Sequence, residues 1–218
     1  MYSFTEENYL KALFNLADKN GEANVKELSK HLDIKMSTVT SMMKKLAEKG
    51  MVHYKSYQPL HLTEKGKKEA GLIIRKHRLT EMFLFEKMGF GWEEVHAIAE
   101  QIEHIHSSVF FDKMDGLLGF PKTDPHGAPI PDKNGKITWK EYKSLSDCKA
   151  GETVKICAVI NSSDDFLRFL NSRNLHLGLK IKIHSIETFD KSMVISYGKK
   201  SAETLSYTAS EKLLVDKV

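Results

Sequence analysis

The stretch NVKELSKHLDIKMSTVTSMMKKLAEKG, residues 24–50, contains two runs of apolar residues at helical spacing. The apolar positions are Val25, Leu28 and Leu32 in the first run, and Val39, Met42, Met43 and Leu46 in the second. The short segment DIK separates the two runs, and Gly50 stands where a left-handed residue commonly ends a helix. A helix, a short turn and a second helix in this order predict a helix-turn-helix motif.

The flanking segments extend this motif on both sides. Upstream, TEENYLKALFNLADKN repeats apolar residues at helical spacing and predicts a helix, with Thr5 as a candidate N-cap. Downstream, MVHYKSYQPLHLTEKG alternates apolar and polar residues around Pro59 and predicts a β-hairpin. We therefore expect a winged helix-turn-helix domain over residues 1–65.

Small hydroxyl and cationic side chains gather at the start of the second helix. Such residues let a helix approach the major groove, where hydroxyls reach bases or phosphates and lysines reach phosphates or guanine. An ordinary N-capped helix with a solvated Ser/Thr face is the alternative for this feature alone. The residues expected to contact DNA are Lys35, Ser37, Thr38, Thr40, Ser41, Lys44 and Lys45.

The charge is unevenly distributed along the 218 residues, although the net charge is only +4. Residues 1–78 carry 15 basic and 9 acidic side chains, a balance of +6, and residues 79–112 carry 1 and 7, a balance of −6. The remaining 17 basic and 13 acidic residues give +4. A basic module followed by an acidic one suits a nucleic-acid-binding domain beside a cation site.

The acidic region combines imidazoles and carboxylates in a regular pattern. We expect one long helix over residues 66–90 and another over 91–114, each with a broad apolar surface that suits a dimer interface. On the second helix, five polar residues fall within about 100° of one another. They are His96, Glu100, Glu103, His104 and Ser107, and the first helix adds His77 and Glu81. Mixed carboxylate and imidazole donors indicate Mn²⁺ or Fe²⁺, with Zn²⁺ also acceptable, whereas a solvated face is the alternative.

The remainder of the chain predicts a linker and a small β domain. Four of the five prolines lie in FPKTDPHGAPIPDKNG, residues 120–135, which is typical of a linker. Short β-like runs follow, interrupted by one helix-like segment, and predict a small barrel. Two cysteines, no apolar run of membrane-spanning length and an acidic start lead us to expect a reduced, cytoplasmic protein.

Along essentially its whole length the chain resembles the diphtheria-toxin-repressor family of metal-dependent bacterial regulators. The matching segments are ENYLKALFNL, STVTSMMKKL, LTEKGKK, RKHRLTEMFL, EVHAIAEQIEH, FPKTDPHGAPIP, SLSDCKAGETVKICAVI and SEKLLVDKV. The resemblance implies a mainly α fold with small β parts: an N-terminal winged helix-turn-helix, a helical dimerisation domain and a C-terminal SH3-like β-barrel. We place these at residues 1–65, 66–119 and 142–218, with a Pro-rich linker at 120–141.

The resemblance also implies two metal sites. The primary site would comprise Asn8, His77, Glu100, Glu103 and His104, and the ancillary site Glu81, His96, Asp124, His126 and Asp165. Iron-type members carry Cys at the position of Glu100 and manganese-type members carry Glu, which favours manganese here. Asn8 departs from the Met or Asp of the family, and Lys11 replaces an acid of some manganese sensors.

These observations predict a homodimeric, Mn²⁺-responsive repressor that binds a palindromic operator, and they predict no enzymatic activity or small-molecule substrate. The resemblance implies that this operator lies near metal-uptake genes. An Fe²⁺-responsive repressor of the same family is the nearest alternative. A metallohydrolase built on the Glu/His stripe is another, although the sequence offers no uncommitted general base beside an open metal position. A metal-independent winged-helix protein with a peptide-binding barrel is the third.

Overall fold

The computed structural model describes residues 2–17, 21–160 and 163–218, and it divides into two compact units. The first unit comprises Met1–Thr80, Ala99–Gly116 and Ile130–Thr138, and the second Glu81–Ile98, Leu117–Pro129 and Trp139–Val218. The boundary crosses the long helix α4, Glu64–Met88, which contributes residues to both units. Among the described helices, none combines the length and apolarity needed to span a membrane.

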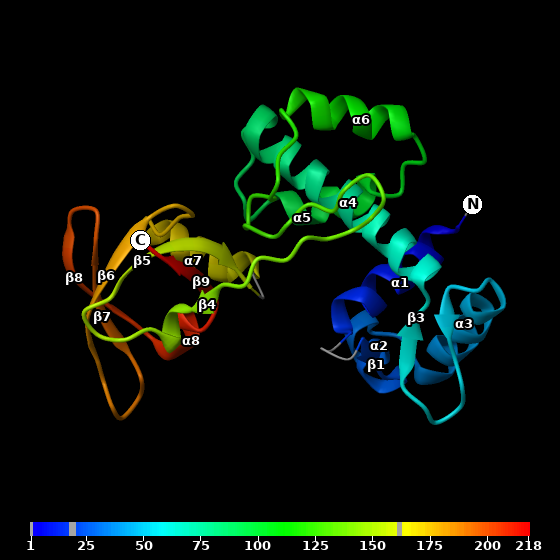
Figure 1. The fold of residues 1–218 in the computed structure, drawn as a ribbon, viewed down its shortest axis with the longest axis horizontal. Helices are drawn as coiled ribbons and strands as arrows, with labels where there is room; N and C mark the ends of the chain where they lie inside the picture. The colour runs from blue at the N-terminus through cyan, green and yellow to red at the C-terminus, as the bar shows by residue number, and fades with distance from the viewer. Residues whose placement is uncertain (1, 18–20, 161–162) are drawn as a thin grey trace. The chain divides into compact units, whose positions relative to one another are not determined.

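The first unit contains the expected helix-turn-helix (Figure 1). Helix α1 is Phe4–Leu16, α2 is Val25–Leu32 and α3 is Met36–Glu48. Capping boxes at Ser3 and Asn24 satisfy the first backbone N–H groups of α1 and α2. The expected N-cap at Thr5 is therefore wrong, because the helix begins at Phe4, two residues before a cap at Thr5 would place its start, and Ser3 supplies the cap.

A small antiparallel sheet completes this domain. Strand β1, Glu22–Ala23, pairs with β3, Leu60–Leu62, which also pairs with β2, Val52–His53. Strands β2 and β3 form the expected wing, and Gly50 adopts φ +69° directly after α3. Side chains of α1, α2, α3 and the strands form one apolar core, which includes Leu10, Leu28, Met43 and Leu60.

The single helix expected over residues 91–114 is wrong. Helix α5 is Val95–Ile102 and α6 is Ser108–Leu117, and residues 103–107 lie between them without helical structure. Ser107 accepts a hydrogen bond from the Phe110 N–H and so caps α6. The side chains of Glu103 and His104 form contacts with other helices, which replace the lost helical bonds with tertiary ones.

The second unit is dominated by an antiparallel sheet with strand order β4-β9-β5-β6-β7-β8. Its strands are β4 Lys143–Ser144, β5 Thr153–Val159, β6 Lys180–Ile186, β7 Met193–Tyr197, β8 Lys200–Leu205 and β9 Leu213–Lys217. A 3₁₀ turn at Leu145–Asp147 and helices α7, Asp164–Ser172, and α8, Tyr207–Ser210, accompany it. Alternating apolar residues of β5, β6 and β7 face one core, to which α7 adds Phe166, Leu167 and Leu170.

The Pro-rich segment contains a tight turn packed on this sheet. Thr123 and Pro129 form an isolated antiparallel bridge, and the Asp124 carboxylate accepts backbone hydrogen bonds from His126 and Ala128. The His126 carbonyl accepts a hydrogen bond from the Val159 N–H of β5. The turn is therefore held in place by backbone bonds, and Asp124 and His126 are buried.

Candidate metal centre

In the first unit, helix α1, the first part of α4 and the end of α5 bring charged side chains together. The Glu103 carboxylate is fully buried, and its Oε2 lies 2.6 Å from His77 Nδ1. Lys11 Nζ of α1 lies 2.6 Å from Glu100 Oε1 and 2.8 Å from both oxygens of Glu103. One ligand atom each from His77, Glu100 and Glu103 lies within 4.8 Å of the others, so they form a compact donor set.

A second acid–imidazole pair lies beside this set. Glu7 of α1 is buried, and its Oε2 lies 2.6 Å from His104 Nδ1. The other nitrogen of His104 is 3.8 Å from Glu103 Oε1, so His104 connects the two groups. The sequence placed the contribution of α1 at Asn8 and did not include Glu7. Its i, i+4 spacing from Lys11 was the available signal, since this spacing puts both on one helix face.

Asn8, which follows Glu7 on α1, has a side-chain carbonyl oxygen that is buried without a hydrogen-bond partner among the described residues. A buried acceptor without a partner is costly, and a bound cation is one way to satisfy it. Oxygen donors from Asn8, Glu100 and Glu103 with an imidazole nitrogen match the preferences of Mn²⁺ and Fe²⁺. The residues present therefore fit a divalent metal.

The electrostatics of Glu103 favour its charged form. Burial would raise the pKa of the Glu103 carboxyl, but the hydrogen bond from His77 and the positive charge of Lys11 outweigh it. The net effect lowers the pKa below its ordinary value. Glu103 is thus a carboxylate at neutral pH, as a metal ligand must be.

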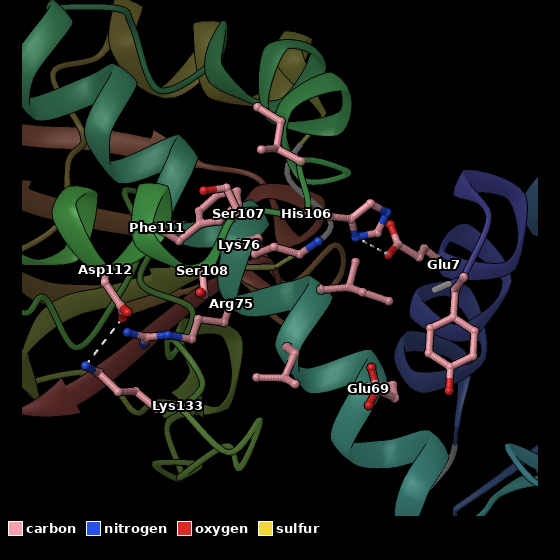
Figure 2. A pocket seen from close by; sticks show the side chains of 14 residues that line it. Glu7, Glu69, Arg75, Lys76, His106, Ser107, Ser108, Phe111, Asp112 and Lys133 are labelled. Carbon is pink, nitrogen blue, oxygen red and sulfur yellow. Dashed lines mark ion pairs between the residues drawn. The ribbon is translucent and has the colours of Figure 1, made fainter.

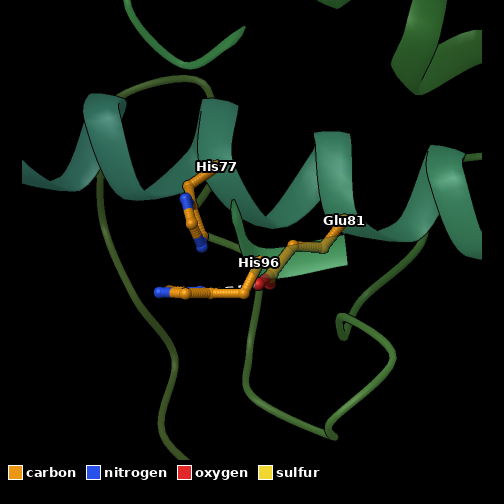
Figure 3. Close-up of side chains that lie close together, drawn as sticks. All are labelled: His77, Glu81 and His96. Carbon is orange, nitrogen blue, oxygen red and sulfur yellow. Dashed lines mark hydrogen bonds and ion pairs between the residues drawn. The ribbon is translucent and has the colours of Figure 1, made fainter. Parts of the chain in front are cut away.

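A further donor set lies entirely within the second unit. Glu81 of α4, Asp124 and His126 are all buried and offer ligand atoms within 4.8 Å of one another. Glu81 Oε2 lies 3.9 Å from His126 Nδ1, and Glu81 Oε1 lies 3.2 Å from Nδ1 of His96 on α5. Figure 3 shows the Glu81 carboxylate beside the His96 side chain, with His77 one helical turn earlier on α4.

The orientation of His126 suits metal ligation. Its Nε2 lies 2.8 Å from the Trp92 carbonyl oxygen, which can only accept, so Nε2 carries the proton. In the neutral imidazole Nδ1 then presents its lone pair toward Glu81, an arrangement that a cation between them would stabilise. Asp165, the fifth residue expected here, instead lies on α7 with its side chain 97% exposed and 3.9 Å from Arg168.

The expected DNA-contacting residues lie on one helix. Thr40 of α3 is half-buried, and the others are exposed: Lys35, Ser37, Thr38, Ser41, Lys44 and Lys45. Lys35 occupies the N-cap position without a side-chain cap, so the first N–H groups of α3 have no bond to that side chain. Lys45 also lies 3.0 Å from the buried Glu6 carboxylate of α1, which ties the helix to its scaffold.

A cavity of about 490 Å³ lies in the first unit, and Glu7, the partner of His104, is one of the residues that line it (Figure 2). Its lining includes Glu7 and His106, whose Oε1 and Nδ1 atoms are 3.7 Å apart, and Lys76 and Phe111. Lys133 and Asp112 form a second ion pair in the lining, 3.4 Å apart. Glu7 therefore pairs with His104 and also faces this cavity.

Exposed apolar side chains lie on or beside helices α4 and α6. Val109 and Phe110 of α6 and the preceding Ile105 are exposed in the first unit. In the second unit, Phe85, Met88, Leu117 and Phe120 are also exposed. Exposed apolar side chains of this kind suit a protein–protein contact.

Comparison with known proteins covers each part of the chain. Residues 1–60 match the iron dependent repressor N-terminal DNA binding domain, and residues 63–132 match the iron dependent repressor metal binding and dimerisation domain. Residues 143–217 match the FeoA domain. These three matches follow the order of winged helix, helical domain and β domain along the chain.

Individual relatives agree with these matches. The chain is 34% identical over 127 residues to the iron-dependent repressor IdeR of Mycobacterium tuberculosis, 58% of this chain and 55% of that protein. It therefore spans about half the length of the IdeR relatives it matches. It is also 34% identical over 118 residues to the transcriptional regulator MntR of Oceanobacillus iheyensis, 54% of this chain and 80% of that protein.

Solved structures extend the likeness to the whole chain. A manganese-dependent transcriptional repressor in complex with manganese has a TM-score of 0.86 and 28% identity, covering 98% of this chain and 100% of that one. ScaR with bound Zn²⁺ has a TM-score of 0.78 and 29% identity, covering 98% and 99%. From the helix-turn-helix, the Glu/His clusters and these matches together, the chain belongs to the diphtheria-toxin-repressor, or iron-dependent repressor, family of metal-dependent transcriptional regulators.

Proposed function

We propose that this protein is a homodimeric, metal-responsive transcriptional repressor that acts in the cytoplasm on a two-fold symmetric DNA operator. Its activating metal is Mn²⁺, with Fe²⁺ as the alternative, and its targets are metal-uptake genes. The observation that carries the proposal is the buried carboxylate–imidazole cluster of His77, Glu100 and Glu103 in the same unit as the exposed helix α3. Metal-dependent repressors among the relatives and structural neighbours support it.

The proposed primary ligands are Asn8, His77, Glu100, Glu103 and His104. Glu103 is held by His77, and His104 by Glu7, so the side chains are oriented before any cation binds. A divalent ion supplies positive charge that offsets the repulsion between neighbouring carboxylates. Because these side chains come from α1, α4 and the end of α5, the filled site would fix those elements relative to one another and thereby the geometry of the dimer.

We further propose an ancillary metal site made by Glu81, His96, Asp124 and His126. The burial of three of these residues and the Nδ1 orientation of His126 support it. Asp165 remains a predicted fifth ligand whose exposed position does not add support.

We propose no enzymatic activity. A metallohydrolase needs an open metal position and a general base that is not itself committed to holding the site. Glu7 is paired with His104, and Glu103 with His77 and Lys11, so these acids are engaged in the cluster.

The deciding experiment is DNA binding as a function of metal. Duplexes selected from a random-sequence pool in the presence of Mn²⁺ would identify a binding site, and anisotropy would then follow binding against free Mn²⁺, Fe²⁺ and Zn²⁺ under anaerobic conditions. We expect affinity to rise with Mn²⁺ and to fall on adding chelator. Equal DNA affinity with and without chelator would contradict the proposal, and hydrolysis of ester or peptide substrates above background would favour the enzyme.

Replacing Lys44 or Lys45 by Ala is expected to weaken binding to all duplexes. A lysine that contacts phosphate contributes about one unit to the slope of log affinity against log salt, so each loss should reduce the slope by about one. Ser37→Ala or Ser41→Ala should instead relax base preference, because hydroxyls near the N-terminus of α3 would face base edges. Salt titrations on matched and mismatched duplexes measure both, and four unchanged variants would exclude α3 as the DNA-contacting helix.

Glu100→Cys is expected to change metal preference. Mn²⁺ is the weakest binder of its series, so a site that responds to it depends on hard oxygen donors, whereas a thiolate is soft. A free thiol also has a pKa near 8.5, which adds proton competition. The variant should respond less to Mn²⁺ and relatively more to Fe²⁺, Co²⁺ or Zn²⁺. An unchanged ratio of Mn²⁺ and Fe²⁺ midpoints for DNA binding would show that Glu100 does not ligate the metal.

A further inference from the structure

The Lys11 ammonium group lies among carboxylate oxygens, which stabilise a positive charge. Its Nζ atom contacts one oxygen of Glu100 and both oxygens of Glu103 at 2.6–2.8 Å, and its side chain is only 13% exposed. An ammonium group has three N–H donors, and here three carboxylate oxygens surround it. The two acids most central to the proposed metal site thus already share one positive charge.

A divalent ion and this ammonium group would require the same oxygens. Carboxylates coordinate through lone pairs that the Lys11 N–H groups use in the structure. Two cations a few ångströms apart in a buried site also repel each other strongly. Occupation of the site through Glu100 and Glu103 therefore requires Lys11 to withdraw.

The lysine side chain is suited to such an exchange. Its charge sits on a flexible four-carbon stem, which can carry the ammonium group toward water while the stem stays packed. Lys11 lies one turn after Glu7 on α1, the helix that also carries Asn8. Withdrawal of Lys11 would thus remove a link between α1 and α5, while ligation through Asn8 would create another.

We infer that Lys11 is a built-in counter-cation that offsets part of the negative charge of Glu100 and Glu103 in the metal-free protein, competes with the divalent metal and so sets the concentration at which the repressor responds. This inference rests on the proposed function. In the metal-free state Lys11 acts together with His77 to offset the buried charge of Glu103, which would otherwise be costly. In return, binding of metal must overcome two short ion pairs, so the site responds at a higher free metal concentration than its donors alone would allow.

The test compares full-length wild type with Lys11→Met, Lys11→Arg and Lys68→Met, by calorimetric titration with Mn²⁺ and by melting of the metal-free protein. Lys11→Met should bind Mn²⁺ about tenfold or more tightly at the first-unit site and melt at a lower temperature without metal. Lys11→Arg keeps the charge and should retain weak binding and wild-type melting. Lys68 is exposed on α4, so Lys68→Met controls for the loss of one positive charge.

The outcomes separate this inference from the proposed function. Weaker or equal Mn²⁺ binding by Lys11→Met would show that Lys11 only stabilises the fold, and it would overturn the inference. If the wild type still bound DNA in a metal-dependent way, the proposed function would remain intact. Mn²⁺ binding by Lys11→Met but not by wild type would support the inference and contradict the function. No binding by either protein would overturn both.

Discussion

Glu103→Gln is expected to abolish metal-activated DNA binding. Glu103 is fully buried, and its oxygens contact both Lys11 and His77. The amide keeps the shape of the side chain but removes the negative charge and one acceptor oxygen, so a divalent ion loses a central ligand. We expect Mn²⁺ affinity at the first-unit site to fall by about 100-fold or more, since an uncompensated change in a buried charged group costs several kcal/mol.

The measurement is Mn²⁺ titration combined with DNA anisotropy, with the oligomeric state followed by light scattering. Glu64→Gln is the matched control, because Glu64 begins α4 in the same unit with its side chain 90% exposed. The variant dimer should persist, since Glu103 is buried and is not among the exposed apolar side chains, such as Val109 and Phe110, that suit a protein–protein contact. Retention of full metal activation, or loss of the dimer, would contradict the role of Glu103.

Gly127→Ala is expected to destroy the proposed ancillary site without altering a proposed ligand. Gly127 adopts φ +87°, and a Cβ atom there would lie 2.3 Å from the Cys157 carbonyl oxygen and 2.6 Å from Ala158 Cα. The left-handed conformation costs an alanine roughly 1–2 kcal/mol, and overlap with the backbone of β5 adds about 1–3 kcal/mol. The turn must therefore lift from β5 and carry Asp124 and His126 away from Glu81.

Calorimetric melting and Mn²⁺ stoichiometry test this expectation. Gly151→Ala is the matched control, because Gly151 has φ +88° but open space where a Cβ would lie. Gly127→Ala should destabilise the second unit more than Gly151→Ala and lose the metal bound there, while the first-unit site remains. Equal effects of the two substitutions would show that close packing of the turn on β5 does not hold the ancillary ligands.

Local sequence patterns predicted most of the elements. The apolar spacing from Val25 to Leu46 predicted α2 and α3, and alternation around Pro59 predicted the wing, both of which are confirmed. The strands β5, β6 and β7, interrupted by helix α7, also agree with the expected short β-like runs and single helix-like segment. These elements could be predicted from the sequence because helical and strand periodicity depend on neighbours within a few residues.

The break between α5 and α6 could not be predicted from periodicity. The polar stripe from His96 to Ser107 continues at helical spacing, so periodicity alone predicts an unbroken helix. Residues 103–107 instead leave the helix, because Glu103 binds His77 and Lys11, His104 binds Glu7, and Ser107 caps α6. Contacts between residues 26 to 97 positions apart outweigh the local pattern there.

The sequence by itself determined the kinds of side chain available: the basic hydroxyl-rich helix, the carboxylates and imidazoles, and the glycines that allow left-handed turns. Only the tertiary structure decided which of them meet. It placed the Lys11 ammonium between Glu100 and Glu103, joined the unexpected Glu7 to His104, and separated Asp165 from Asp124 and His126. The physical reason is that a buried charge is stable only beside a partner, and packing of distant helices selects that partner.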